Sequence, residues 1–141
     1  MSSAFLRKQV TVSKAKKRAW AAFSIYLRTL WTLPGYVECY TCGKHCTLKG
    51  TPGQRIMVGH WVEGHSAITY INEQFVRPQC FRCNMMMGGN QGEFRDRIRK
   101  ELGAKTDELL ALSKTSVKIT APEYLQKEAY YKEKLSLLTD N

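Results

Sequence analysis

Two Cys-x-x-Cys motifs constrain this chain more than any other feature of its sequence. Cys39 and Cys42 form the first motif, and Cys80 and Cys83 form the second. A Cys-x-x-Cys turn directs two sulfur atoms at one point, so two such turns complete a tetrahedral zinc site without a water ligand. We therefore predict that the four cysteines bind zinc. A site with no open position implies a structural metal rather than a catalytic one.

The segment that contains both motifs supports this interpretation. Residues 36–83 are rich in glycine, cysteine and β-branched residues, which favours short strands and loops. Their apolar runs are too short to build a core, and a metal would supply the missing stability. His45 and Cys46, beside the first motif, could replace a zinc ligand, but local packing roles are favoured because four cysteines already complete the site.

Helical signals flank this segment. Apolar residues recur at helical spacing from an N-cap at Ser13 to the Leu33-Pro34-Gly35 stop. A second helix is predicted over 91–102 and a short one over 107–112. Thr120-Ala121-Pro122-Glu123 is a capping box for a last helix. The apolar stripe of that helix (Tyr124, Tyr131, Leu135 and Leu138) is expected to be core, although a dimer contact stays open.

The predicted fold is therefore α+β and mostly helical, in one compact domain. Residues 1–12 are expected to be a flexible basic leader. Residues 13–105 would hold the first helix and the zinc-bound segment, and residues 106–141 a helical extension.

The charge distribution indicates a polyanionic partner. The net charge is +10, and no acidic residue occurs before Glu38. Basic side chains that release counterions on binding phosphates would suit DNA, although a solvated basic surface is the plain alternative. The DNA-binding candidates are Lys14, Lys17, Arg18, Arg28, Arg82, Arg95 and Arg99.

The expected location of the protein in the cell follows from two signals that are not visible in the sequence. No secretory signal and no apolar run of membrane-spanning length is visible, so the cytoplasm is expected, with no membrane partner. Cysteines in such a chain favour metal binding over disulfides.

Three polar residues in and after the enclosed segment suggest phosphodiester hydrolysis. That reaction needs a base to activate water and a cation to stabilise the transition state. His60, at the end of a strand-like run, is the candidate base. Asn84, directly after Cys83, is the candidate ligand of Mg²⁺ or Mn²⁺, and Asn72 would orient His60 through its amide.

The order of these motifs resembles the HNH or His-Me finger nucleases, particularly the zinc-containing endonuclease VII type. The resemblance is strongest to the phage NinG/Rap recombination proteins, on Gly59-His60-Trp61, Ile71-Asn72-Glu73, Gln79 to Asn84, and Gly89 to Arg95, with the basic stretch from Lys17 to Arg28. It covers about Lys14 to Leu138. It implies a zinc-stabilised ββα-metal finger that cuts branched DNA such as Holliday junctions, leaving a 5′ phosphate and a 3′ hydroxyl.

One position departs from many HNH enzymes. Gly59 stands where they carry an aspartate that binds the catalytic metal, although the NinG/Rap proteins also tend to have glycine there. The second protein ligand is therefore open among Asn90, Glu93, Glu73 and His65, or phosphate and water would complete the site. Glu93 could equally pair with Arg97.

Two further expectations follow. Symmetric cutting of a four-way junction needs two active sites, so a homodimer is expected, with no small-molecule cofactor. The competing hypothesis is a zinc protein that binds DNA junctions without cutting them, which would leave His60 and Asn72 without a chemical role.

Overall fold

The computed structural model describes residues 10–64 and 66–140. Most of the leader predicted for residues 1–12 lies outside these ranges, as does His65. The described chain is α+β and mostly helical, as predicted, with two small antiparallel sheets. None of its helices contains an apolar stretch of the length that crossing a bilayer requires.

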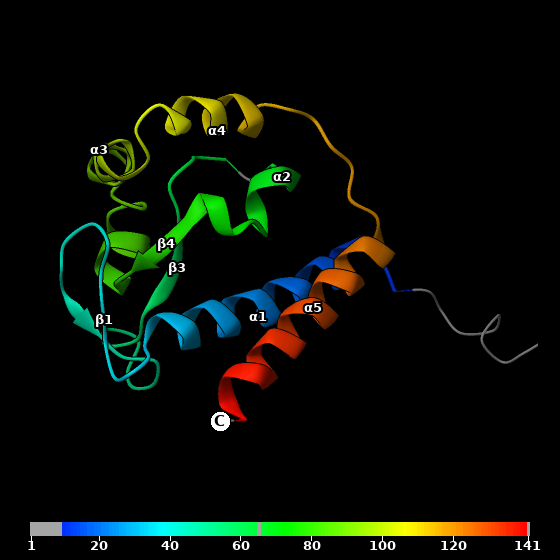
Figure 1. The fold of residues 1–141 in the computed structure, drawn as a ribbon, viewed down its shortest axis with the longest axis horizontal. Helices are drawn as coiled ribbons and strands as arrows, with labels where there is room; N and C mark the ends of the chain where they lie inside the picture. The colour runs from blue at the N-terminus through cyan, green and yellow to red at the C-terminus, as the bar shows by residue number, and fades with distance from the viewer. Residues whose placement is uncertain (1–9, 65, 141) are drawn as a thin grey trace, which may run out of the picture.

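Two long helices from opposite ends of the chain lie side by side (Figure 1). They are α1 (Val12–Trp31) and α5 (Ala121–Thr139). The prediction of Ser13 as the N-cap of α1 was wrong, because the hydroxyl of Thr11 accepts the amide hydrogen of Lys14 at 3.2 Å. Thr120 and Glu123 form the predicted capping box of α5.

The apolar stripe of α5 belongs to the core. Tyr124 and Tyr131 are buried with Phe23 and Leu27 of α1, while Leu135 and Leu138 of the stripe pack against this cluster. The core interpretation is therefore confirmed, and this stripe is covered within the chain. The predicted extension over 106–141 thus completes a helix pair with the N-terminal helix.

Two short hairpins lie beside the helix pair. β1 (Val37–Glu38) pairs with β2 (His45–Cys46), and the first cysteine motif lies in their connection. β3 (Met57–His60) pairs with β4 (Val76–Gln79), which places His60 opposite Val76. The connection between β3 and β4 contains α2 (Ala67–Tyr70) and the 3-10 turn η2 (Glu73–Phe75), which were not predicted.

The chain after β4 turns through a short π-helical segment, η3 (Arg82–Met86), which carries Cys83 and Asn84. The predicted helix over 91–102 is confirmed as α3 (Gln91–Leu102). The short helix predicted over 107–112 is longer, as α4 (Lys105–Ser113).

The β3–β4 ribbon lies between two apolar clusters. Val58 and Val76 join the α1–α5 cluster, whereas Trp61 and Phe75 pack with a second cluster made by α3 and α4. Figure 1 shows the same order, with the ribbon between the long helix pair and the α3–α4 segment. This ribbon positions the candidate site.

Candidate functional site

The four cysteines of the two motifs converge on one point. Their sulfur atoms all lie within 4.8 Å of one another. The Sγ atoms of Cys42 and Cys80 are 3.7 Å apart. Tetrahedral zinc with Zn–S bonds of about 2.3 Å would place its sulfur ligands about 3.8 Å apart. The predicted grouping is confirmed, and its donors and spacing fit a metal ion such as zinc.

Backbone hydrogen bonds shape both turns. The amide of Cys39 donates to the carbonyl of Lys44 at 2.7 Å, and the amide of Gly43 donates back to the carbonyl of Cys39 at 2.8 Å. In the second turn, the amide of Cys83 donates to the sulfur of Cys80 at 3.4 Å. An amide that donates to sulfur, as that of Cys83 does, stabilises thiolate charge, which a zinc-binding cysteine must carry.

The thiols of the cluster differ in their pKa values. Burial and, to a lesser extent, the neighbouring sulfurs raise the pKa of Cys42 to about 12. Burial also raises the pKa of Cys80. At Cys39 burial acts in the same direction, but hydrogen bonds from Thr41 and from backbone amides lower the pKa to about 6. A metal ion bound at this point needs thiolate ligands, so its binding would release these protons.

The two other candidates near the first motif have packing roles. His45 lies 3.3 Å from a carboxylate oxygen of Glu38, and its ring stacks on Tyr36 with centroids 4.4 Å apart. Cys46 is 1% exposed and packs against cysteines of the four-cysteine cluster. Neither belongs to the metal-binding group found in the described part of the chain.

His60 ends β3 and is held in a single orientation. Its Nε2 lies 2.9 Å from the backbone carbonyl of Tyr70, so Nε2 donates and the neutral ring carries its lone pair on Nδ1. Trp20 of α1 stacks on the ring at 5.5 Å, and the ring of Tyr70 lies parallel at 5.8 Å. The backbone of His60 is also fixed, because Gln91 Nε2 donates to its carbonyl at 2.9 Å.

Asn72 does not orient His60 in the way that was predicted. Its Nδ2 donates to the carbonyl of Ile68 at 3.2 Å, and its Oδ1 accepts the amide hydrogen of Gln74 at 3.0 Å. Asn72 therefore caps η2 and stabilises the loop that carries the Tyr70 carbonyl. Its effect on His60 is indirect.

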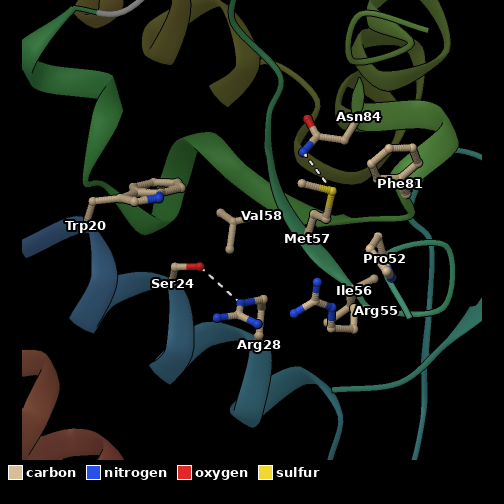
Figure 2. A pocket seen from close by; sticks show the side chains of 10 residues that line it. All are labelled: Trp20, Ser24, Arg28, Pro52, Arg55, Ile56, Met57, Val58, Phe81 and Asn84. Carbon is tan, nitrogen blue, oxygen red and sulfur yellow. Dashed lines mark hydrogen bonds between the residues drawn. The ribbon is translucent and has the colours of Figure 1, made fainter. Parts of the chain in front are cut away.

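Asn84 and His60 line the same hollow, which has a volume of about 370 Å³. The position of Asn84 follows from η3, because its amide donates to the carbonyl of Cys80 at 3.0 Å. Its side-chain Nδ2 lies 3.6 Å from Met57 Sδ, and Figure 2 shows its oxygen directed away from that sulfur. The structure thus brings the candidate base and the candidate metal ligand together.

The three other proposed metal ligands that lie within the described residues are engaged elsewhere. Asn90 Nδ2 lies 3.7 Å from the sulfur of Cys83, so this residue supports the zinc site. Glu93 pairs with Arg97 at 2.7 Å, which is the surface alternative considered above. Glu73 accepts a hydrogen bond from Tyr131 at 3.2 Å. Instead, the hollow is lined by the exposed Glu63, which the sequence analysis did not select.

Gln79 is a second residue that the sequence analysis missed. Its side chain is fully buried, and its Nε2 donates to Gly89 O at 2.7 Å and to Thr41 Oγ1 at 3.1 Å. A Cβ atom at position 59 would overlap this amide, at 2.7 Å from Gln79 Cδ. Gly59 is therefore required by packing, and an aspartate would not fit at this position without displacing Gln79.

The basic candidates divide into two groups. Arg18 pairs with the buried Glu128 at 2.9 Å and Arg99 pairs with Asp107 at 3.1 Å, so both have partners within the chain. Lys14, Lys17 and Arg82 are exposed, while Arg28 and Arg95 are partly buried.

Comparisons of the chain with protein-family models, curated proteins and solved structures found no match.

Proposed function

We propose that this chain is a metal-dependent endonuclease of the HNH or His-Me finger type that cleaves branched DNA such as four-way junctions. One observation carries the proposal: His60, with its tautomer fixed by a backbone carbonyl, shares a hollow with Asn84. The order β3, β4, η3 also follows the strand–strand–helix order of the ββα-metal finger that the NinG/Rap resemblance implies.

His60 acts as the general base in this proposal. Its Nδ1 takes a proton from a water molecule, and the resulting hydroxide attacks the phosphorus atom of the scissile phosphodiester. The bond from phosphorus to the 3′ oxygen breaks and the departing 3′ oxygen takes a proton from solvent water, which leaves a 5′ phosphate and a 3′ hydroxyl. The stacked rings of Trp20 and Tyr70 hold the imidazole in place throughout.

Asn84 would hold the catalytic Mg²⁺ or Mn²⁺. Its amide oxygen is a hard donor, which these ions prefer, and the carboxylate of Glu63 lines the same hollow. The ion would supply positive charge beside the pentavalent transition state and the departing 3′ oxygen. The zinc held by the four cysteines orders the turn that carries Asn84 and takes no part in the chemistry.

A junction-binding protein without nuclease activity is the second candidate. The observation in its favour is that Asn90, Glu93 and Glu73 all have partners away from the hollow. Fewer protein ligands then remain for a catalytic metal. The exposed cations of α1 would serve both candidates equally, since phosphate contacts give affinity without chemistry.

The deciding experiment is cleavage of an end-labelled four-way junction with Mg²⁺ or Mn²⁺, beside a linear duplex of the same sequence. We expect cleavage near the branch, and we expect His60→Ala to lose at least about 100-fold in rate. His45→Ala is the matched control, because His45 is exposed and lies outside the hollow. Equal cleavage by the His60→Ala protein would remove His60 as the base. Tight junction binding without cleavage would favour the second candidate.

The same cleavage experiment also tests the oligomeric state of the protein. Symmetric resolution of a four-way junction needs two active sites, so we propose that the active form is a homodimer. Paired, simultaneous nicks across the junction would support this, and a single nick per binding event would argue for a monomer.

A further inference from the structure

A second hollow lies between α1 and the start of β3, with a volume of about 340 Å³ (Figure 2). Trp20, Ser24 and Arg28 line it from the helix. Arg55 lines it from the loop that precedes β3, and Phe81 and Asn84 close its far end. Because Asn84 lines both hollows, this one adjoins the proposed catalytic site.

The charged side chains that line this hollow are all positive. Arg28 and Arg55 both contribute to it, and no acidic residue lines it. Within the described ranges neither guanidinium forms an ion pair, although Arg28 Nε donates to Ser24 Oγ at 3.1 Å. Burial lowers the pKa of Arg28, and the charge of Arg55 lowers it further.

Two like charges in a partly buried hollow repel each other, and this repulsion disappears when an anion binds between them. The charge arrangement therefore favours an anionic ligand. A phosphate is an anion that paired guanidinium groups recognise well, because their planar N–H donors match its oxygens. The rings of Trp20 and Phe81 leave apolar surface beside the cations, which suits a sugar or base attached to that phosphate.

We propose that Arg28 and Arg55 form a binding site for a backbone phosphate of nucleic acid, next to the phosphate that the His60–Asn84 centre would cleave. The position of this subsite relative to the cut rests on the proposed function, whereas the phosphate binding does not. The subsite would fix the register of the strand in the catalytic hollow and carry no sequence preference.

The test measures junction binding by fluorescence anisotropy over a salt series, without added Mg²⁺ or Mn²⁺ so that no strand is cut and the metal held by the cysteines stays in place. Arg55→Gln is the main variant, because Arg55 is exposed on a loop and its loss should leave the fold intact. Lys118→Gln is the control, since Lys118 is exposed and lines neither hollow. We expect Arg55→Gln to weaken binding on the order of tenfold and to reduce the salt slope by about 0.9.

Arg28→Lys is the second variant. This substitution keeps the positive charge and removes the planar guanidinium group. We therefore expect weaker binding with an unchanged salt slope. Lys118→Gln should alter neither quantity by more than a small fraction. Salt slopes that are equal for wild type and Arg55→Gln would overturn the proposal.

A second arm separates the sources of phosphate. Calorimetric titration with inorganic phosphate should show weak binding that Arg55→Gln abolishes. If that binding is lost while the junction salt slope is unchanged, the hollow takes a small free phosphate and the nucleic-acid assignment is wrong. If Arg55→Gln reduces the salt slope but the wild-type protein never cuts DNA, the subsite is supported and the nuclease proposal is wrong. Cleavage together with an unchanged salt slope would do the reverse.

Discussion

The substitution Gly59→Ala tests how tightly the strand that carries His60 packs against the rest of the site. A Cβ at position 59 would overlap Oε1 of Gln79 and would lie 2.7 Å from its Cδ and 2.8 Å from its Cγ. The Gln79 side chain is fully buried and is held by hydrogen bonds to Thr41 and Gly89. It therefore cannot move aside without losing those bonds.

The expected cost combines two effects. Forcing an extra methyl group into a packed interior costs about 1–3 kcal/mol. The two hydrogen bonds of the Gln79 amide contribute about 0.5–1.5 kcal/mol each. If the strained side chain gives up one of them, Gly59→Ala should lower the free energy of unfolding by about 3 kcal/mol. That is a large share of the roughly 5–15 kcal/mol that holds a typical domain together.

The assay is urea unfolding of the zinc-loaded protein in a double-mutant cycle of Gly59→Ala with Gln79→Ala. Removing the Gln79 amide also removes the atoms that the new methyl group would meet. We therefore expect the double variant to be about as stable as Gln79→Ala alone, with a coupling energy of about 2 kcal/mol or more.

The matched control for this cycle is Gly53→Ala. Gly53 has an ordinary backbone conformation, and a Cβ there would meet no atom within 4 Å. Its substitution should change the free energy of unfolding by no more than about 0.5 kcal/mol. If Gly59→Ala resembles Gly53→Ala, or if its effect simply adds to that of Gln79→Ala, the packing argument is wrong.

Three further predictions concern the metal and the helices. Chelation of the metal, or Cys83→Ser, should remove about one zinc per chain and lower the melting temperature in differential scanning calorimetry; an unchanged melting temperature would contradict a structural role. Thr120→Ala should cost about 1 kcal/mol in urea unfolding, because it removes the capping box of α5, whereas the exposed Thr139→Ala should cost less. The hydrogen bond from Arg18, with support from Lys132, lowers the pKa of Glu128 below its ordinary 4.5. The ionised Glu128 carboxylate should contribute its full stability above pH 4.5. That contribution should be lost as the pH falls through the lower pKa that Glu128 has in the folded state. The advantage of wild type over Glu128→Gln should therefore be larger at pH 7 than at pH 3, and a constant difference would count against this ion pair.

The parts of the fold that could be predicted are those that local chemistry determines. The helix over 91–102 follows from apolar residues at four-residue steps, and Thr120 with Glu123 marks the start of α5 by a short-range hydrogen-bond pattern. The cysteine cluster was equally accessible, because Cys-x-x-Cys spacing alone directs paired sulfurs at one point. These signals need no knowledge of the tertiary structure.

The orientation of His60 could not be predicted in the same way. Its ring is held by the carbonyl of Tyr70, and a backbone carbonyl has no signature in the sequence. Asn72 was chosen because its side chain could reach a histidine, but asparagine amides often bond to their own loop, as this one does. Gln79 was missed for a related reason, since a glutamine in a strand reveals nothing about the three segments that it contacts.

The four-cysteine cluster and the proposed active site form one structural unit. Asn84 follows Cys83 directly, and Asn90 joins the sulfur of Cys83 to the loop that begins α3. Gln91, the next residue, donates to the carbonyl of His60. The proposed base and the proposed metal ligand are therefore both connected to the cysteine cluster through a few hydrogen bonds and one peptide link.

Zinc binding should consequently control cleavage more strongly than it controls DNA affinity. The basic residues of α1 lie on a helix that packs against α5 and does not depend on the cysteines for its core. Loss of zinc would thus leave part of the phosphate-binding surface in place while it releases the turn that holds Asn84. Because that turn positions a ligand and not a whole surface, small displacements would affect the reaction first and binding later.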